Sequence, residues 1–421
     1  MTAATDFDAF FAELTKIRRH LHENPELSFQ EIKTQAFVRD YLIHQAHIPA
    51  DQIRDCARTG LVVDIFNPAD DPSPPTQTKL HCIAFRGDMD ALPMTERNPH
   101  LQHQSKVAAT AHMCGHDGHT ANLMGFASLA QQRCHLLPPH STIRLLFQPA
   151  EEGHFGAPAM IKEGCLDGVD EVYGYHNASY PLGNIHVKSG PIMAHGGLFT
   201  ITISGPGGHG SAPHVTKDPI VAAGQVILAI QTIASRSISP HESAIISICQ
   251  IHGGEADNVI PSSVKLSGTV RDFSPAVESS VKQRMTAIVE QTCAAFELQG
   301  QIEFKDMYPV VVNSKQETQV IQSIAAAVVG EKKVSEQGLP RSGAEDFAFF
   351  LQARPGCFFF IGTKHESDSQ NRNAHSDTYD FNDDILPLGV RMFLEIAQHR
   401  FRCALYTPHE LEAMTSKLLA K

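Results

Sequence analysis

The segment Ala111-His-Met-Cys114-Gly-His116-Asp-Gly-His119-Thr120 combines three histidines, a cysteine and an aspartate with two glycines that let the backbone turn. Thiolates and imidazoles are good ligands for zinc and other late divalent metals. Cys114 and His116 are two residues apart, so their side chains point the same way in an extended or turning segment. Apolar residues at helical spacing follow from Thr120. The segment therefore predicts a metal site at the entrance of a helix, where the helix dipole favours a thiolate.

The alternative for this segment is a histidine-rich loop that binds nothing, and other polar residues weigh against it. The carboxylate pair Glu151-Glu152 follows a predicted buried strand over 141–147, and His176 follows another over 171–175. His375 lies in the loop after a third predicted strand, over 355–362. Strand ends are where α/β folds place their sites. Of two adjacent carboxylates, one could bind metal while the other acts as the base in metal-assisted hydrolysis. The alternative for Glu151-Glu152 is a solvated acidic turn.

Two aspartates follow the predicted buried strand over 80–85, in the run Arg86-Gly-Asp88-Met-Asp90. Asp88 could orient a metal-binding imidazole or itself touch metal, which is the usual task of a carboxylate near such a site. Its alternative is a turn residue that caps the next segment. For Asp90, a functional role and a structural role are equally compatible with the sequence.

Length and composition bound the class of protein. A chain of 421 residues with 42% hydrophobic content suggests two globular domains. The net charge of −12 argues against a nucleic-acid or anionic-membrane partner. The nine cysteines are odd in number and scattered, which favours a reducing compartment over a disulfide framework. With no signal peptide visible and no run of membrane-spanning length, we expect a cytoplasmic protein.

Hydrophobic periodicity predicts most of the elements. Amphipathic helices are expected over 7–22 and 28–45, the second with a capping box of Ser28 and Glu31. A strand is expected over 60–66, and the proline-rich stretch 70–78 reads as a surface loop. Near the C-terminus, helices are expected over 316–329, at 343–350, and from about 385 and 408.

The middle of the chain predicts a separate domain. Strands over 198–204, 244–251, 264–270 and 301–304 alternate with helices over 218–236 and 276–296, which is the βαββαβ order of a ferredoxin-like fold. We therefore predict a catalytic domain over 1–195 and 309–421 that wraps around an inserted domain over 196–308. The loop Gly205–His214 could bring the His209 imidazole close to a ligand, or it could be a flexible hairpin. Asn258 and Arg271 are the other polar residues of interest there, each with a turn or solvent role as the alternative.

Motifs in order along nearly the whole chain resemble the M20 metallopeptidase family, and most of all its amidohydrolase branch of auxin-conjugate hydrolases, hippurate hydrolases and N-acyl amino acid deacylases. The motifs are Arg19-His-Leu-His22, Pro25-Glu-Leu27, Asp88-Met-Asp-Ala-Leu-Pro93, Cys114-Gly-His-Asp-Gly-His119, Pro149-Ala-Glu-Glu-Gly153, Gly174-Tyr-His176, Gly207-Gly-His-Gly-Ser211, Asn258-Val-Ile-Pro261, Glu345-Asp-Phe347 and His375-Ser376.

This resemblance implies an α/β fold: a zinc-exopeptidase-like catalytic domain with a mixed sheet flanked by helices, plus the inserted ferredoxin-like domain. It implies two divalent metal ions held by Cys114, His116, Glu152, His176 and His375. Glu151 would be the general base, with Asp88 as an orienting residue. His209, as a catalytic residue, and Asn258 would help to hold the scissile carbonyl or the substrate carboxylate, across a dimer interface. Apart from the resemblance, Arg271 and His214 are the other candidates for contact with substrate. His195-Gly196-Gly197 departs from the small and acidic residues expected at the domain junction.

The predicted activity is hydrolysis of an N-acyl amino acid, of acetyl, benzoyl or indoleacetyl type, to a carboxylic acid and a free amino acid. The nearest alternative is a dipeptidase or carboxypeptidase of the same family. A cysteine amidase using Cys114 and a metal- or amino-acid-binding protein without catalysis are the more distant ones. Zinc, manganese, cobalt and nickel all suit mixed sulfur, nitrogen and oxygen ligands. An open sheet edge in the inserted domain favours a homodimer.

Overall fold

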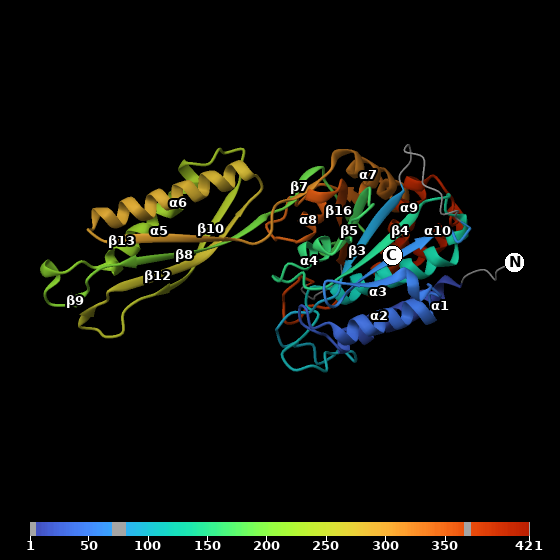
Figure 1. The fold of residues 1–421 in the computed structure, drawn as a ribbon, viewed down its shortest axis with the longest axis horizontal. Coiled ribbons are helices and arrows are strands. Elements are labelled where there is room, and N and C mark those ends of the chain that lie inside the picture. The colour runs from blue at the N-terminus through green and yellow to red at the C-terminus, as the bar shows by residue number, and fades with distance from the viewer. Residues whose placement is uncertain (1–5, 70–80, 366–371, 421) are drawn as a thin grey trace. The chain divides into compact units, whose positions relative to one another are not determined.

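The computed structural model describes residues 6–69, 81–365 and 372–420, and these divide into two compact units (Figure 1). Unit 1 comprises Met1–Gly190, Val312–Leu339 and Phe349–Lys421, and unit 2 comprises Pro191–Val311 and Pro340–Ala348. The main segment of unit 2, Pro191–Val311, thus begins and ends within a few residues of the inserted domain predicted over 196–308. Unit 2 also includes the short segment Pro340–Ala348, which was not predicted. The loop predicted over 70–78 lies outside the described residues.

Unit 1 is built on a mixed eight-stranded sheet with the order β1-β2-β4-β3-β5-β16-β6-β15. The central pairs β4–β3, β3–β5 and β5–β16 are parallel, and β1 and β2 continue the sheet in antiparallel fashion. Every residue of β3 is buried, as expected for a strand covered on both faces. The strands are β1 (Ile53–Cys56), β2 (Gly60–Phe66), β3 (Cys82–Asp88), β4 (Thr142–Gln148), β5 (Glu171–Pro181), β6 (Ile185–His186), β15 (Val334–Ser335) and β16 (Gly356–Lys364).

Helices flank this sheet, which confirms the predicted α/β class (Figure 1). The apolar face of the first helix, with Leu14, Ile17 and Leu21, is buried in the core of unit 1. The helices are α1 (Phe7–Glu23), α2 (Ile32–His44), α3 (His116–Gln132), α4 (Gly156–Lys162), α7 (Lys315–Val329), α8 (Phe347–Ala353), α9 (Leu386–Phe401) and α10 (Pro408–Leu419).

The capping box predicted for α2 is wrong. Glu31 is the N-cap residue and makes no side-chain capping bond. Its carboxylate instead accepts hydrogen bonds from Thr59 Oγ1 at 2.5 Å and from the Ala150 N–H at 2.9 Å, while Ser28 Oγ donates to Asp90 at 2.7 Å. Residues distant in sequence compete for both side chains, so the local pattern was misleading.

Unit 2 has the predicted ferredoxin-like arrangement. Its four-stranded antiparallel sheet has the order β10-β12-β8-β13, and α5 and α6 pack against it around one apolar core (Figure 1). A small ribbon pairs β9 with β11. The elements are β8 (His195–Ser204), β9 (Gly208–His209), α5 (Pro219–Arg236), β10 (Ala244–His252), β11 (Val259–Ile260), β12 (Ser263–Asp272), α6 (Pro275–Ala295) and β13 (Gln299–Asp306). The short strands β7 (Gly190–Met193) and β14 (Val311–Asn313) contain the first and last residues of its main segment.

Helix α5 is long and apolar enough to cross a membrane by length and composition alone, contrary to the expectation of no run of that length. Ala222, Val226 and Ile230 are fully buried in the core of unit 2. The helix contacts β8, β10 and β12. Packing on the four-stranded sheet therefore accounts for the buried apolar face of α5, whereas Leu228 on the same helix is 65% exposed.

Candidate active site

Helix α3 begins at His116, four residues earlier than expected. Gly115 is its N-cap residue and has φ +96°, in the left-handed region that favours glycine. A Cβ on Gly115 would lie 2.2 Å from Asn177 Oδ1 and 2.5 Å from the Tyr379 hydroxyl. Gly115 therefore allows the chain to turn sharply between Cys114 and the first helical turn, where His116 and His119 lie.

Replacing Gly115 with alanine is expected to destabilise the fold by about 2–5 kcal/mol. The new methyl group combines a strained backbone conformation with overpacking against Asn177 and Tyr379. Urea unfolding of the two proteins measures the difference. A matched control is Gly224→Ala, where the added Cβ meets nothing within 4 Å. Equal loss of stability in both variants would contradict the role given to Gly115.

The five predicted metal ligands converge in unit 1. The ligand atoms of Cys114, His116 and His176 all lie within 4.8 Å of one another, as do those of Cys114, Glu152 and His375. Cys114 Sγ is 3.3 Å from His176 Nε2, and His375 Nε2 is 3.2 Å from Glu152 Oε1. Cys114 belongs to both groups, so the predicted ligands form one cluster. His176 lies in the middle of β5 rather than at its end, because the strand continues to Pro181.

The histidines of the cluster are oriented as metal ligands are. Nδ1 of His116 lies 3.0 Å from the Asp90 carbonyl and 3.2 Å from Asp90 Oδ1, and Nδ1 of His176 lies 2.7 Å from the Asn177 carbonyl. Carbonyl and carboxylate oxygens accept from Nδ1–H, which leaves Nε2 of each ring with a lone pair facing the cluster. The side chain that holds His116 is thus that of Asp90, whose role the sequence left open.

Asp88 has a different neighbour. It is fully buried and lies 2.6 Å from Nδ1 of His119 and 2.6 Å from Nη1 of Arg86. Nε2 of His119 accepts the Asn177 N–H at 3.1 Å, so both ring nitrogens of His119 are satisfied. Burial opposes ionisation of Asp88, but Arg86 and the two histidines outweigh it and hold its pKa well below the ordinary range. Asp88 also lies 3.4 Å from His116 Nε2, at the edge of the cluster.

The carboxylate pair is held by a strained turn after β4. Ala150 has φ +57°, and its N–H donates to Glu31. The Glu152 N–H donates to Asp90 Oδ2 at 3.0 Å. Glu151 is 6% exposed, and its carboxylate lies within 4.8 Å of ligand atoms of His116 and Glu152. The turn therefore presents both carboxylates to the cluster, and Glu31 and Asp90 are the supporting residues.

The donor set fits divalent cations. Among the residues that the structure describes, His116 Nε2 and Glu152 Oε1 are buried and make no hydrogen bond. Burial and the charge of Glu152 raise the pKa of the Cys114 thiol, while burial and His119 lower the pKa of His176. Hydrogen bonds to Cys114 and Glu152, however, raise the pKa of His375 to about 10, so the pKa shifts alone do not distinguish a metal site from the thiolate–imidazolium pair of a cysteine nucleophile. A cation would satisfy His116 Nε2 and Glu152 Oε1 together and favour the thiolate, so these two unpaired atoms support a metal site over a cysteine amidase.

A buried ionic network supports the first turn of α3 from α1. His22 Nδ1 lies 2.8 Å from Asp117 Oδ2, and Arg18 contacts Asp117 and Asp383. Burial works against the charged imidazole, but hydrogen bonds to Asp117 and Glu96 outweigh it and raise the pKa of His22 to about 9. The role of His22 could not be predicted from its motif, because its partners Asp117 and Glu96 are distant in the chain.

This network predicts a pH dependence of stability. A histidine has a pKa of about 6.5 when unfolded, so the stabilisation from a charged His22 is complete below that pH and is lost as pH rises toward 9. The wild-type free energy of unfolding should therefore fall between pH 6.5 and 9, and His22→Gln should remove much of that slope. Urea unfolding across this range tests the prediction, and an unchanged slope in the variant would contradict it.

The remaining predicted residues, His209, His214, Asn258 and Arg271, lie in unit 2. His209 is exposed in β9, where its Nδ1 accepts from the Ser211 N–H at 3.1 Å. β9 pairs with β11, and the Asn258 carbonyl accepts the Gly210 N–H at 2.8 Å. The structure thus brings His209 and Asn258 to one ribbon. His214 is exposed nearby in the chain, whereas Arg271 is half-buried and donates to the Val270 carbonyl at 2.9 Å.

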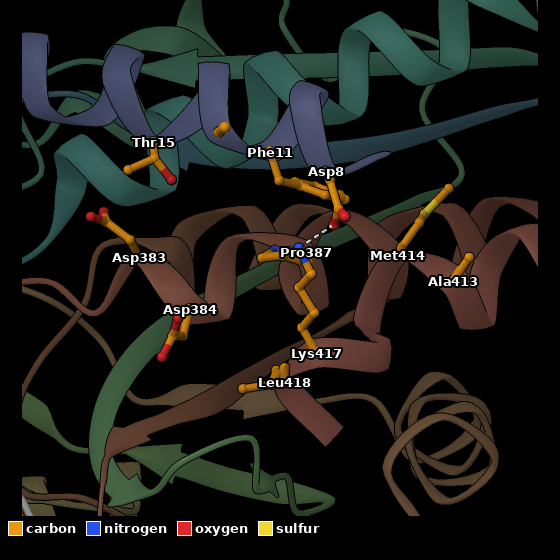
Figure 2. A pocket seen from close by; sticks show the side chains of 11 residues that line it. Asp8, Phe11, Thr15, Asp383, Asp384, Pro387, Ala413, Met414, Lys417 and Leu418 are labelled. Carbon is orange, nitrogen blue, oxygen red and sulfur yellow. Dashed lines mark ion pairs between the residues drawn. The ribbon is translucent and has the colours of Figure 1, made fainter. Parts of the chain in front are cut away.

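A surface pocket of unit 1 lies apart from this chemistry (Figure 2). It is formed between α1, α9 and α10, and an ion pair of 2.7 Å joins Asp8 and Lys417 beside it (Figure 2). The pocket contains none of the predicted site residues. Its lining residues are Asp8, Phe11, Ala12, Thr15, Asp383, Asp384, Pro387, Ala413, Met414, Lys417 and Leu418.

Strands β4 and β5, the first turn of α3 and the loop after β16 bring paired carboxylates, histidines and a cysteine to one cluster, an arrangement typical of metal-dependent hydrolases. Comparison with known proteins agrees. Residues 84–399 match the family described as "Peptidase family M20/M25/M40". The N-acetyl-L-cysteine deacetylase of Bacillus subtilis (strain 168) is 40% identical over 358 residues, which are 85% of this chain and 82% of that protein. Thermostable carboxypeptidase 2 of Saccharolobus solfataricus is 38% identical over 90% of this chain and 92% of its own.

One solved structure is similar to this chain over nearly its whole length. The crystal structure of the Bacillus subtilis YXEP protein, described as a dinuclear metal-binding peptidase from the M20 family, has a TM-score of 0.79 and 32% sequence identity. The match covers 94% of this chain and 99% of that one. The chain therefore belongs to peptidase family M20/M25/M40 and is an enzyme that hydrolyses amides. The resemblance stated from the sequence motifs is confirmed.

Proposed function

We propose that this enzyme is a metal-dependent amidohydrolase that cleaves N-acyl amino acids to a carboxylic acid and a free amino acid. The observation that carries the proposal is the position of Glu151, a buried carboxylate beside the predicted ligands His116 and Glu152. Binding alone requires no further carboxylate at that point, whereas hydrolysis requires a base. The similarity to N-acetyl-L-cysteine deacetylase supports the N-acyl amino acid class.

Cys114, His116, Glu152, His176 and His375 would hold two divalent ions, for which zinc, manganese, cobalt and nickel are the candidates. Such ions supply Lewis acidity, which activates water and polarises the scissile carbonyl. Glu151 would take a proton from the water through its carboxylate and later give it to the leaving amine. Asp90 orients His116. Asp88 keeps its proposed role as an orienting residue at the cluster edge.

The residues of unit 2 are proposed to act on the substrate. His209 would donate to the developing oxyanion, which is worth about 3 kcal/mol for one well-placed donor. Asn258, Arg271 and His214 would contact the rest of the substrate. Replacing His209 with alanine and comparing kcat and KM tests the first of these roles.

The activity is tested with a panel of acetyl, benzoyl and indoleacetyl amino acids beside dipeptides and longer peptides. Mass detection identifies the released carboxylic acid and amino acid, and each assay is run with each candidate metal. Faster cleavage of acyl amino acids than of any peptide supports the proposal. Faster cleavage of peptides would favour the carboxypeptidase or dipeptidase alternative. The similarity to thermostable carboxypeptidase 2 is the observation that supports this alternative.

We also propose a homodimer formed through unit 2. Strand β10 is an edge of the four-stranded sheet and exposes Ile245 and Ile251. The adjacent helix α5 exposes Leu228, which is 65% accessible. An open sheet edge flanked by exposed aliphatic side chains can pair with a second copy of itself.

Replacing Leu228 with glutamate is therefore expected to convert a dimer into a 46.0 kDa monomer. A buried charge at the interface has no partner there and opposes association. Ile32→Glu is the matched control, because Ile32 is 66% exposed on α2 in unit 1. Light scattering after size-exclusion chromatography measures the mass. A wild-type monomer, or a dimer that survives Leu228→Glu, would contradict the proposed interface.

A cytoplasmic location is proposed from the nine free cysteines and the acidic net charge of −12. The same charge supports a protein with no nucleic-acid or membrane partner. Cell fractionation tests the location.

A further inference from the structure

We propose that unit 2 carries a separate site for a divalent transition-metal ion of the zinc class, formed by His195, Glu278 and Asp306. This site uses the run His195-Gly196-Gly197, which departs from the residues expected at the domain junction. One ligand atom from each of the three residues lies within 4.8 Å of the others. The proposal is independent of the catalytic cluster, since all of its residues belong to unit 2.

The register of the sheet brings the residues together. In the pairing of β12 with β8, Asp272 lies opposite His195. In the pairing of β13 with β8, Asp306 lies opposite Gly197. His195 and Gly197 are two residues apart on one strand and therefore share a face. Glu278 comes from the first turn of α6.

His195 is prepared as a ligand. Its Nδ1 lies 2.8 Å from Oδ2 of the fully buried Asp272, so the carboxylate accepts the Nδ1–H and leaves the lone pair on Nε2. This carboxylate–histidine pair is the usual support of a metal-binding imidazole. The His195 side chain is 4% exposed, and among the described residues its Nε2 has no hydrogen-bond partner.

Nε2 of His195 is directed at two carboxylates. It lies 3.9 Å from Glu278 Oε1 and 3.9 Å from Asp306 Oδ1, too far for hydrogen bonds. A zinc ion bound at about 2.0–2.2 Å from each atom would bridge such separations. Gly197 leaves the space open, because a Cβ there would lie 3.1 Å from His195 Cε1 and 3.6 Å from Nε2.

Lys282 is the competing cation. Its ammonium lies 2.5 Å from Glu278 Oε1 and 2.6 Å from Asp306 Oδ1. Asp272 adds a third carboxylate on the other side of the His195 ring, so the cluster holds three carboxylates and one ammonium and keeps an excess of negative charge. The neighbouring Arg271 makes no ion pair with these carboxylates among the described contacts, and its guanidinium donates to the Gly197 and Val270 carbonyls. The Lys282 side chain is 27% exposed and long, so it can swing into solvent when a metal ion enters.

The test compares zinc binding by the full chain and by variants of this cluster. Each protein is dialysed to equilibrium against a series of buffered free zinc concentrations, and bound zinc is counted by mass spectrometry. We expect His195→Gln to bind one ion fewer than the wild type. Asp272→Asn should keep the ion with about 10–100-fold weaker affinity, as measured for such supporting carboxylates. Lys282→Met should bind it more tightly, because the competing ammonium is gone.

Asp306→Asn provides the same comparison without disturbing a buried side chain, since Asp306 is 59% exposed, and it carries the test if His195→Gln fails to fold. Every protein in the series keeps the predicted ligands of unit 1, so ions bound there are common to all and cancel in the difference. Identical binding curves for the wild type and the folded variants would overturn the proposal, whatever the activity of the enzyme.

Discussion

Glu151→Gln is expected to lower kcat by about 10²–10⁴-fold, which is the usual contribution of a positioned general base. The amide has nearly the shape of the carboxylate, but it cannot take the proton of the attacking water or pass one to the leaving amine. Glu151 is 6% exposed and lies within the ligand cluster, so bulk water cannot readily replace it. Metal content should be unchanged, because Glu152 and the other predicted ligands remain.

Steady-state kinetics on the best acyl amino acid, together with metal analysis of the same preparation, provide the measurement. Glu412→Gln is a suitable control, because Glu412 is exposed on α10. A variant that keeps more than a tenth of the wild-type rate would show that Glu151 is not the base. Loss of metal from Glu151→Gln would instead assign this residue to metal binding.

Cys114→Ser is expected to remove most of the bound metal and to lower turnover by at least about 100-fold. Cys114 is the one residue common to the group with His116 and His176 and the group with Glu152 and His375. A hydroxyl stays neutral where a thiolate would bind, so both groups lose a charged ligand. Dialysis of the wild type against a chelator should give the same loss of activity, and added metal should restore it.

The control is Cys249→Ser, which changes an exposed cysteine on β10 and should alter neither metal content nor rate. A wild-type enzyme that survives the chelator but is inactivated by thiol alkylation would favour the cysteine amidase alternative. Full metal content in Cys114→Ser would contradict the role of this residue as a ligand.

Regular elements could be predicted from the sequence because their burial follows the hydrophobic pattern. The strands of unit 2 begin and end within a few residues of the expected ranges, since buried residues alternate with more accessible ones along most of β8 and β12. Prediction was less accurate where polar residues lie in the core. The start of helix α3 at His116 could not be read from the hydrophobic pattern, because its first turn is polar and yet entirely buried. Strand β5 continues beyond His176 through Asn177, whose side chain is held by the Tyr379 hydroxyl.

The predicted ligands could be found because their chemistry is unusual and most of them lie beside the end of a strand or the start of a helix. Their supporting residues could not, because support depends on contacts between distant segments. Asp90 holds both His116 and the Glu152 backbone, yet its sequence context is equally typical of a turn. Glu31 holds the turn at Ala150, although its spacing from Ser28 indicates a helix cap.

The central claim is that Cys114, His116, Glu152, His176 and His375 hold two divalent ions at one site. The most direct measurement is anomalous diffraction from crystals grown with zinc or manganese. The account predicts two strong peaks among these five side chains, with Cys114 beside both. Peaks elsewhere in unit 1, or none within bonding distance of Cys114, would contradict it.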